Sequence, residues 1–296
     1  MREGRCLACD DRVVRLGRRG VWDYGYCTSC GAVQLMSPPS DEELSRLYRD
    51  EYHQSGHLNA DPTFQDQERR RVVLQMADTV AQCQQGGSVK RLVVELGAGW
   101  GALGQELVRR GFPYLGLEPN EQMAAHARSR GLDVITGALE QIDQLVRGAA
   151  IHTFVSMAVY EHLLHQEAAL RRQAELLAPD GAIVIQAPTA GIPRAVGKLF
   201  TALQPNRELP GLFGSLAPPW HVLLPTPQSI RVQAARCGLQ LNRVLVSRAG
   251  RRRDFRKWLQ IASEQVGDIG HSLVGERWPL CVAQIYVLGR TPVNDS

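Results

Sequence analysis

The sequence lacks long apolar runs, is poor in aromatic residues and carries no large excess of charge of one sign. Of its 296 residues, 6% are aromatic, and the formal net charge is +4. No window approaches the roughly 18 to 20 consecutive apolar residues of a membrane-spanning helix. The stretch MREGRCLACD has charges and cysteines where a secretory peptide would have an apolar run. We therefore expect a cytoplasmic protein without membrane association, with enough apolar residues for one large domain and a small one.

Cysteine is also sparse, yet its placement is informative. The seven cysteines are an odd number, and four of them form two CxxC pairs separated by seventeen residues, namely Cys6 with Cys9 and Cys27 with Cys30. In a reducing compartment this spacing favours a metal over disulfides, because two pairs of thiolates on tight turns can surround a tetrahedral zinc ion. Because sulfur fills all four coordination positions, none is left for water, and the sequence predicts a structural zinc site. The alternative is a redox pair, but nothing nearby resembles a thioredoxin-like strand and helix.

These cysteines define a small zinc-binding module over residues 1–38, which is too short to fold on its own core. Zinc binding, worth ~10 to 16 kcal/mol in zinc-finger peptides, can supply the missing stability. Residues 39–90 are predicted to form a helical connector or cap. Its first helix starts with Ser40 as N-cap and Glu43 at capping-box spacing, and helical periodicity returns over 63–85 before a pair of glycines.

The remaining residues, 91–296, alternate between strand and helix patterns. Strands are expected at 91–95, 114–118, 132–136, 152–157 and 182–188, separated by helices at 101–110, 120–130, 139–147 and 164–177, the last closed by APDG. Strands joined by helices of this length predict parallel crossovers and a sheet covered on both faces. Towards the end of the chain a helix at 227–239 and strands at 241–247 and 281–289 change the pattern. The predicted fold class is α/β, a doubly wound and mostly parallel sheet with a small N-terminal zinc-binding module.

A glycine-rich loop follows the first of these strands in VVELGAGWGALG, residues 93–104. In a doubly wound sheet the ligand lies beyond the carboxyl ends of the strands, where such a loop lets backbone N–H groups approach it. Gly97, Gly99 and Ala102 also satisfy a dinucleotide spacing, so the glycines alone do not identify the ligand. Glu95 discriminates better, because a carboxylate at the strand end would repel a pyrophosphate by about 4 kcal/mol for unit charges ~4 Å apart at an effective dielectric of 20.

S-adenosylmethionine (SAM) suits an acid followed by glycines, because it carries an amino group and a sulfonium and no phosphate. A second acid, Glu118, ends the next strand seventeen residues after Gly101 and can accept hydrogen bonds from both ribose hydroxyls. The alternative is that Glu95 points away and that the loop is only a tight turn between strand and helix.

Three segments resemble the class I SAM-dependent methyltransferases: VVELGAGWG, YLGLEPN and VYEHLLHQEAALRRQAELLAPDGAIVIQAPT. The resemblance implies a Rossmann-like seven-stranded sheet whose last two strands form a reversed hairpin at the edge. It also implies the cofactor-binding residues Glu95, Gly97, Ala98, Gly99 and Gly101 around the methionine end, Glu118 for the ribose, Ala138 and Leu139 near the adenine, and Pro119 and Met157. The Asp expected near the adenine is absent from TGALE, so that segment offers only backbone and apolar contacts.

Two histidines are candidate general bases, since an unperturbed imidazole titrates near working pH. His162 lies in YEHL, where the chain of this class passes the methyl donor, and its alternative role is to fix a helix start. His221 lies in PPWHVLLPTPQSI, within a predicted substrate-capping insert at about 189–226, and its alternative role is to bond backbone in a loop. With the two CxxC pairs, this segment resembles zinc-containing sugar and natural-product C-methyltransferases, in which the aligned histidine is the base. The chain departs from that branch at Trp220 and Leu224, where the branch has Glu and Tyr.

In that branch the zinc module and connecting helix help to close the substrate cleft. Tyr48, Tyr52 and His53 are therefore candidates to face the substrate or, alternatively, to pack the helix. The basic run at 248–257 can bind a substrate phosphate, RNA phosphates or an acidic protein partner, or can be a solvated helix face. RNA is not favoured, because no aromatic residues interleave with the basic ones to stack bases.

The sequence thus predicts a SAM-dependent methyltransferase with a structural zinc, in which His221 or His162 removes a proton from the acceptor. The acceptor is expected to be a small or carrier-linked metabolite, such as a nucleotide sugar or a natural-product intermediate. The alternatives are an RNA methyltransferase and a SAM-binding regulatory protein without catalysis.

Overall fold

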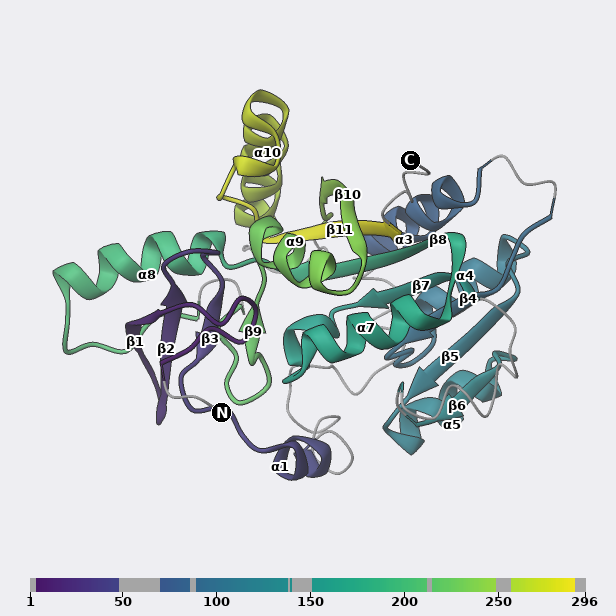
Figure 1. The fold of residues 1–296 in the computed structure, drawn as a ribbon, viewed down its shortest axis with the longest axis horizontal. Helices are drawn as coiled ribbons and strands as arrows, with labels where there is room; N and C mark the ends of the chain where they lie inside the picture. The colour runs from purple at the N-terminus through teal and green to yellow at the C-terminus, as the bar shows by residue number, and fades with distance from the viewer. Residues whose placement is uncertain are drawn as a thin grey trace.

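The centre of the molecule is a seven-stranded sheet with the order β10-β11-β8-β7-β4-β5-β6 (Figure 1). The computed structural model describes residues 4–47, 70–85, 89–137, 139, 151–211, 215–248 and 257–290. The strands are β4 (Val93–Leu96), β5 (Tyr114–Glu118), β6 (Val134–Thr136), β7 (Ile151–Met157), β8 (Leu177–Pro188), β10 (Leu239–Val246) and β11 (Ala283–Arg290). Strands β6, β5, β4, β7 and β8 pair in parallel, whereas β11 is antiparallel to both β8 and β10. The predicted doubly wound, mostly parallel sheet with a reversed hairpin at its edge is confirmed.

Helices cover both faces of this sheet and enclose two hydrophobic cores. Helices α3 (Arg70–Cys83), α4 (Ala102–Arg109) and α5 (Glu121–Ser129) pack on one face, and α7 (Gln166–Leu176) and α9 (Pro227–Arg236) pack on the other. Because successive strand residues point to opposite faces, Val93 belongs to the first core and Val94 to the second. The continuous apolar strands of the sequence are those of a sheet that is buried on both sides.

The start of helix α1 (Asp41–Arg46) follows from a local sequence signal. The Ser40 hydroxyl accepts a hydrogen bond from the Glu43 N–H, and the Glu43 carboxylate accepts one from the Ser40 N–H. The predicted capping box is therefore confirmed. The predicted helix at 139–147 lies outside the described residues apart from Leu139, and so do the two glycines at 86–87.

The APDG segment departs from its prediction, because it lies within β8 and does not close helix α7. Leu177 already pairs with Ile151 of β7, and the ladder resumes only where Ala182 pairs with Thr153. The four residues between Leu177 and Ala182 form an irregular excursion of the strand. The buried Leu177 side chain belongs to the core, which explains why the strand begins before the expected turn.

The N-terminal cysteines lie at the end of a strand or in turns beside a second, smaller sheet. Its strands are β1 (Val13–Arg19), β2 (Trp22–Cys27), β3 (Val33–Leu35) and β9 (Leu223–Leu224), all antiparallel to their neighbours. Strand β9 comes from the predicted capping insert, and helix α8 (Gly191–Leu203) from the same insert lies over this sheet (Figure 1). One cluster joins the two segments and contains Leu16, Tyr24, Val33, Leu35, Ala190, Leu209, Leu216 and Leu224. The module and the insert therefore share a core, although the paired residues of β3 and β9, such as Gln34 and Leu223, are 189 or more positions apart along the chain.

Two helices were not predicted from the sequence. Helix α8 is one of them, and α10 (Lys257–Val274) is the other, which projects beyond the rest of the molecule (Figure 1). Glycines interrupt the helical pattern of α10, and Gly270 is needed where the helix meets Trp278, since a Cβ there would lie 2.0 Å from the indole. Within the described part of the chain, no helix combines the length and the apolar character needed to cross a membrane.

Candidate active site

The glycine loop between β4 and α4 lies at the carboxyl edge of the large sheet. Gly97 and Gly101 have φ values of +69° and +86°, a left-handed conformation that favours glycine. A Cβ on Gly97 would lie 2.4 Å from Cγ2 of Val159, and a Cβ on Gly101 would lie 2.5 Å from Cδ1 of Leu132. The loop backbone is thus pressed against Val159, which follows β7, and against Leu132, which precedes β6, and only glycine fits at these two positions.

Glu118 ends β5 beside this loop, and backbone donors fix its carboxylate. Oε2 accepts a hydrogen bond from the Gly99 N–H at 2.8 Å, and Oε1 accepts one from the Asn120 N–H at 2.9 Å. The side chain is 5% exposed, and this burial raises the pKa of Glu118 against the lowering effect of the two hydrogen bonds. Each carboxylate oxygen retains a lone pair, so the group can accept further hydrogen bonds from a diol such as a ribose.

Glu95 lies deeper than Glu118, on the sheet face that α4 covers. It is 1% exposed, and its Oε2 accepts a hydrogen bond from the Tyr114 hydroxyl at 2.6 Å. Burial raises the pKa of Glu95 to about 8, with a further contribution from the charge of Glu118. The structure thus gives Glu95 a protein partner within the core, and direct contact of this carboxylate with a ligand stays a prediction. Nothing in the apolar strand pattern around Tyr114 marks it as that partner.

Trp100, within the same loop, carries a buried donor that lacks an acceptor among the described residues. Its side chain is 6% exposed, and the indole Nε1–H makes no hydrogen bond with that part of the chain. The ring packs edge-on against His126, with 5.2 Å between ring centroids. A buried orphan donor in a glycine loop is the kind of group that a polar ligand can satisfy. The glycine cradle and this donor therefore fit a polar cofactor.

A short 3-10 turn, η4 (Tyr160–His162), follows β7 and carries the predicted His162. Ala158, just before it, has φ of +56°, a left-handed conformation that is rare for a residue with a side chain. Such strain is often found at functional sites. In the turn itself Glu161 is 1% and His162 is 9% exposed.

The structure brings the two predicted histidines together. The rings of His162 and His221 are edge-to-face with 4.9 Å between centroids. Nδ1 of His162 lies 2.8 Å from the Trp220 carbonyl, and Nδ1 of His221 lies 2.8 Å from the Ser215 carbonyl. Oε1 of Glu161, which the prediction of site residues did not include, lies 3.9 Å from Nε2 of His162. The position of Glu161 next to His162 in YEHL was the sequence signal that could have identified it as a site residue.

The other predicted residues have varied surroundings. Ala98 is buried in the loop, Pro119 is exposed, and Met157 at the end of β7 and Leu139 are half-buried. The remaining predicted candidates lie outside the described residues, namely Ala138, Tyr48, Tyr52, His53 and most of the basic run at 248–257.

The four predicted zinc ligands form one cluster. The ligand atoms of Cys6, Cys9, Cys27 and Cys30 lie within 4.8 Å of one another, with the Cys6 and Cys30 sulfurs 3.6 Å apart and the Cys9 and Cys27 sulfurs 3.4 Å apart. All four are free thiols. Backbone N–H groups donate to two of the sulfurs at 3.4 Å, from Ala8 to Cys6 and from Cys30 to Cys27. Four sulfurs with backbone donors around them fit a tetrahedral zinc ion.

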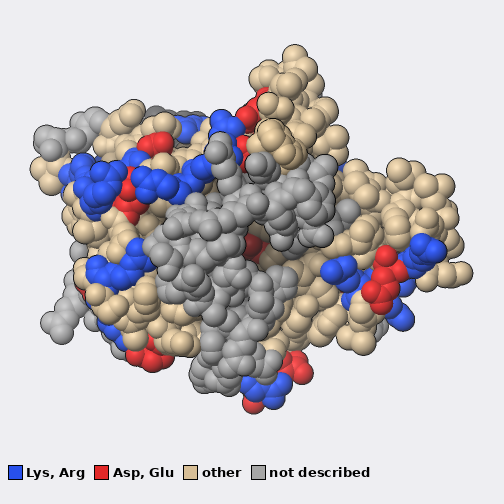
Figure 2. All heavy atoms as spheres, turned by 180° about the vertical axis from the view of Figure 1, so that it is seen from behind, with Lys and Arg blue, Asp and Glu red and all other residues tan. Residues whose placement is uncertain are grey.

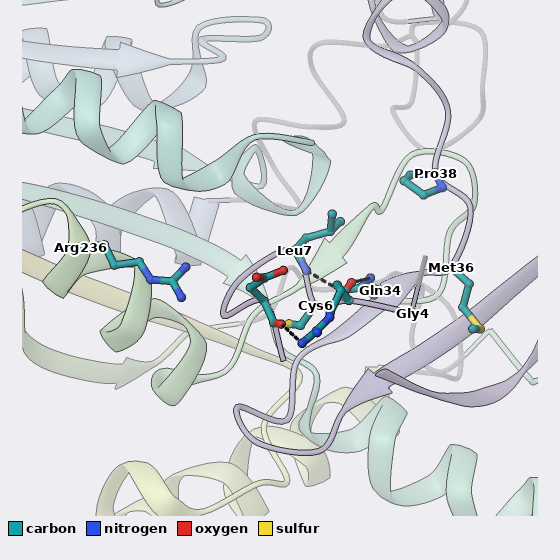
Figure 3. Close-up of a pocket in the computed structure, with 9 residues that line it drawn as sticks. Gly4, Cys6, Leu7, Gln34, Met36, Pro38 and Arg236 are labelled. Carbon is teal, nitrogen blue, oxygen red and sulfur yellow. Dashed lines mark hydrogen bonds between the residues drawn. The ribbon is translucent and has the colours of Figure 1, made fainter. Parts of the chain in front are cut away.

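Side chains from the main domain hold this cysteine cluster in place. The Arg236 guanidinium of α9 donates to the Ala8 and Cys9 carbonyls, and the Thr226 hydroxyl donates to the Cys30 carbonyl. Arg236 and Cys6 both line a cavity of about 330 Å³. Figure 3 shows Arg236 pointing into it from the side opposite Met36 and Pro38. None of the lining residues of this cavity belongs to the glycine loop or to η4, so it is separate from the candidate active site.

Several basic side chains on the surface stand beside acidic ones. Figure 2 shows Lys and Arg next to Asp and Glu on the described part of one face. Arg15 and Arg18 both pair with Asp23, and Arg110 pairs with Glu106 and Asp78. Such pairing weakens the electrostatic attraction of these residues for a polyanion.

The strand order, the reversed hairpin and the glycine loop at the carboxyl edge define a class I SAM-dependent methyltransferase. The sequence model of the family described as a methyltransferase domain matches residues 66–244, which is more than half of the chain. The protein therefore belongs to this methyltransferase-domain family. A comparison with curated proteins finds no match.

Solved structures with the same fold are distant in sequence. A chain from the complex of the Haloferax volcanii Trm112 methyltransferase activator with a methyltransferase is 14% identical, covers 83% of this chain and 99% of its own, and has a TM-score of 0.53. Magnesium protoporphyrin IX methyltransferase from Synechocystis, solved with S-adenosylhomocysteine (SAH), is 16% identical. The match covers 85% of this chain and 100% of the methyltransferase, with a TM-score of 0.52. The plantazolicin methyltransferase BamL, also with SAH, is 14% identical, with 83% and 96% coverage and a TM-score of 0.51. At this identity the likeness shows the fold alone.

Proposed function

We propose that the protein transfers the methyl group of SAM to a small or carrier-linked metabolite, with nucleotide sugars and natural-product intermediates as the substrate class. The observation that carries the proposal is the carboxylate of Glu118, which the Gly99 and Asn120 N–H groups hold at the rim of the glycine loop. Glu95 lies buried beneath the same loop with its pKa raised to about 8, so the acid available to a ligand is Glu118. A carboxylate at this position suits a ribose-bearing ligand without phosphate.

On the donor side, the protein binds SAM and orients it. The backbone of Gly97, Gly99 and Gly101 lines the methionine end of SAM, and Glu118 accepts the ribose hydroxyls. When bound, SAM supplies an electrophilic methyl group on its sulfonium. Because this displacement requires in-line approach, alignment of donor and acceptor provides much of the rate enhancement.

On the acceptor side, His221 or His162 takes the proton. In each ring Nδ1 faces a backbone carbonyl, which only accepts, so the proton of the neutral ring is on Nδ1. The lone pair is then on Nε2, where it can accept a proton from a hydroxyl or a carbon acid. An amine acceptor would need no such base.

The cysteine cluster is proposed to hold a structural zinc ion. Four sulfurs complete the ligand set, and none of the four cysteines belongs to the glycine loop. The ion would therefore stabilise the small sheet and take no part in the chemistry. Because thiolate ligands persist in a reducing compartment, we propose a cytoplasmic location. We also propose that the basic run at 248–257 can bind a protein partner.

Calorimetry with SAM, SAH and NAD tests the donor, and a methyl-transfer assay on acceptor panels and cell extracts tests the activity. We expect SAM and SAH to bind and NAD not to bind. Glu118→Gln should weaken SAM binding, whereas Glu121→Gln, an exposed acid at the start of α5, should not. Uptake of NAD without SAM would contradict the proposal, and SAM binding with no product in any extract would identify a regulatory protein. Mass spectrometry of metabolites that co-purify would name the substrate class.

A further inference from the structure

A second cluster of metal-ligating side chains lies apart from the cysteines. Glu161, His162 and His221 each offer a ligand atom, and these atoms lie within 4.8 Å of one another. The first two come from η4, and the third comes from the insert before β9. We refer to these three residues as the Glu-His-His cluster.

The hydrogen bonds of the two histidines engage the same nitrogen, Nδ1, in both rings. Nδ1 of His162 faces the Trp220 carbonyl and Nδ1 of His221 faces the Ser215 carbonyl, both at 2.8 Å. Metal-binding histidines usually donate their second N–H to a carbonyl or carboxylate in this way, which fixes the tautomer and the ring orientation. Nε2 of each ring is therefore the ligand atom.

The backbone around the cluster joins its two segments firmly. The Val222 N–H donates to the Glu161 carbonyl at 2.8 Å. The Gln166 side-chain amide donates to the Tyr160 carbonyl at 2.7 Å and to the Leu223 carbonyl at 3.2 Å. The cluster thus stands on a hydrogen-bonded frame in which a ligand set can be held in fixed geometry.

We propose that the Glu-His-His cluster binds a divalent transition-metal ion of the zinc type. Two imidazoles and one carboxylate form the three-ligand set of catalytic zinc sites, which leave one position open, in contrast to the closed set of four thiolates. Oε1 of Glu161 and Nε2 of His162 are 3.9 Å apart, and two ligand atoms on one zinc ion lie about 3.3 Å apart. For this pair a side-chain movement of less than an ångström is enough, and all the ligand atoms lie within 4.8 Å of one another. The Glu161 carboxylate is 1% exposed, and a bound cation balances its charge in the protein interior.

The position of the cluster gives the ion a chemical role, and this part rests on the proposed function. Val159, two residues before Glu161, lies against the glycine loop at Gly97. An acceptor hydroxyl bound at the open position would have its pKa lowered by the ion, so its proton would leave to solvent. The oxygen then forms a bond to the SAM methyl carbon, the carbon–sulfur bond breaks, and its electron pair stays on sulfur. Where the cluster holds the ion, the histidines are its ligands, and the ion replaces the general base proposed above.

Metal content of the full-length protein tests the proposal. The protein is saturated with zinc, dialysed, and measured by mass spectrometry of the metal against protein concentration. We expect two zinc equivalents for the wild type and one for His221→Asn and for Glu161→Gln. The control is His165→Asn, an exposed histidine in the same region that pairs with Asp41, and it should keep two equivalents.

A single equivalent in the wild type would overturn the proposal, and so would two equivalents that persist in His221→Asn. Calorimetric SAM binding by His221→Asn shows that this variant is folded. It also separates the two proposals, since SAM binding with one equivalent of zinc refutes only the metal site. Two equivalents without SAM binding refute only the methyltransferase function.

Discussion

Glu95 allows a direct test of the electrostatics beneath the glycine loop. Its carboxyl is 1% exposed, and burial raises its pKa from 4.5 to about 8. Between these values the folded protein retains a proton that the unfolded chain releases. The resulting stability is fully present below pH 4.5 and is lost as the pH rises through about 8. Each pH unit in this window lowers the free energy of unfolding by up to about 1.4 kcal/mol.

Glu95→Gln removes this titration. The glutamine oxygen can still accept the Tyr114 hydrogen bond, but its amide N–H groups require a new acceptor, at a cost of about 1 to 3 kcal/mol that does not depend on pH. The free energy of unfolding of the variant, measured relative to wild type, should therefore rise by about 3 to 4 kcal/mol between pH 5 and pH 8. Urea denaturation at constant ionic strength and saturating zinc, repeated across this pH range, measures the difference.

The matched control is Glu106→Gln on the neighbouring helix α4. Hydrogen bonds and ion pairs with Arg109 and Arg110 hold the pKa of Glu106 at about 2. The stabilising contribution of Glu106 is lost only as the pH falls towards that value. The free energy of unfolding of this variant, plotted against pH, should therefore run parallel to that of wild type from pH 5 to pH 8. If the Glu95→Gln curve also runs parallel to wild type, Glu95 is ionised throughout, and the argument from its burial is wrong.

Other perturbations test the remaining parts of the site. Glu118→Gln should weaken SAM binding roughly 10- to 100-fold, because hydrogen bonds to a charged group are worth about 1.5 to 3 kcal/mol, and a loss below threefold in calorimetry would argue against ribose binding. Gly97→Ala should lower both the melting temperature and SAM affinity. Gly131→Ala, also at positive φ but with no atom within 4 Å of its Cβ, should lower only the melting temperature, and equal effects of the two would exclude a steric role. Cys6→Ser should lose one zinc equivalent and destabilise the protein by several kcal/mol, whereas unchanged metal content and melting temperature would refute the zinc site.

The features that the sequence predicted are those whose signals are local. The capping box at Ser40 and Glu43 needs only residues three apart, and the strands of the large sheet are apolar runs bounded by turns. The glycine loop and the acid at the end of β5 are likewise read within a few residues. Fold class, sheet and donor loop could therefore be predicted from the sequence.

The features that the sequence left undetermined depend on packing between distant segments. Helix α8 and strand β9 take their form from the cysteine-bearing sheet on which they lie, so the insert alone carries no clear pattern. Tyr114 becomes the partner of Glu95 only because parallel pairing sets β4 beside β5.

The amino-acid sequence by itself determined the methyltransferase sheet, the glycine loop and the four cysteine positions, because each is encoded by residues close together in the chain. Only the tertiary structure decided that Glu161 and His162 meet His221, which is 59 positions further along, and that the N-terminal module shares its core with the insert. The physical reason is that such encounters depend on how the faces of separate elements pack, and no local periodicity records that choice.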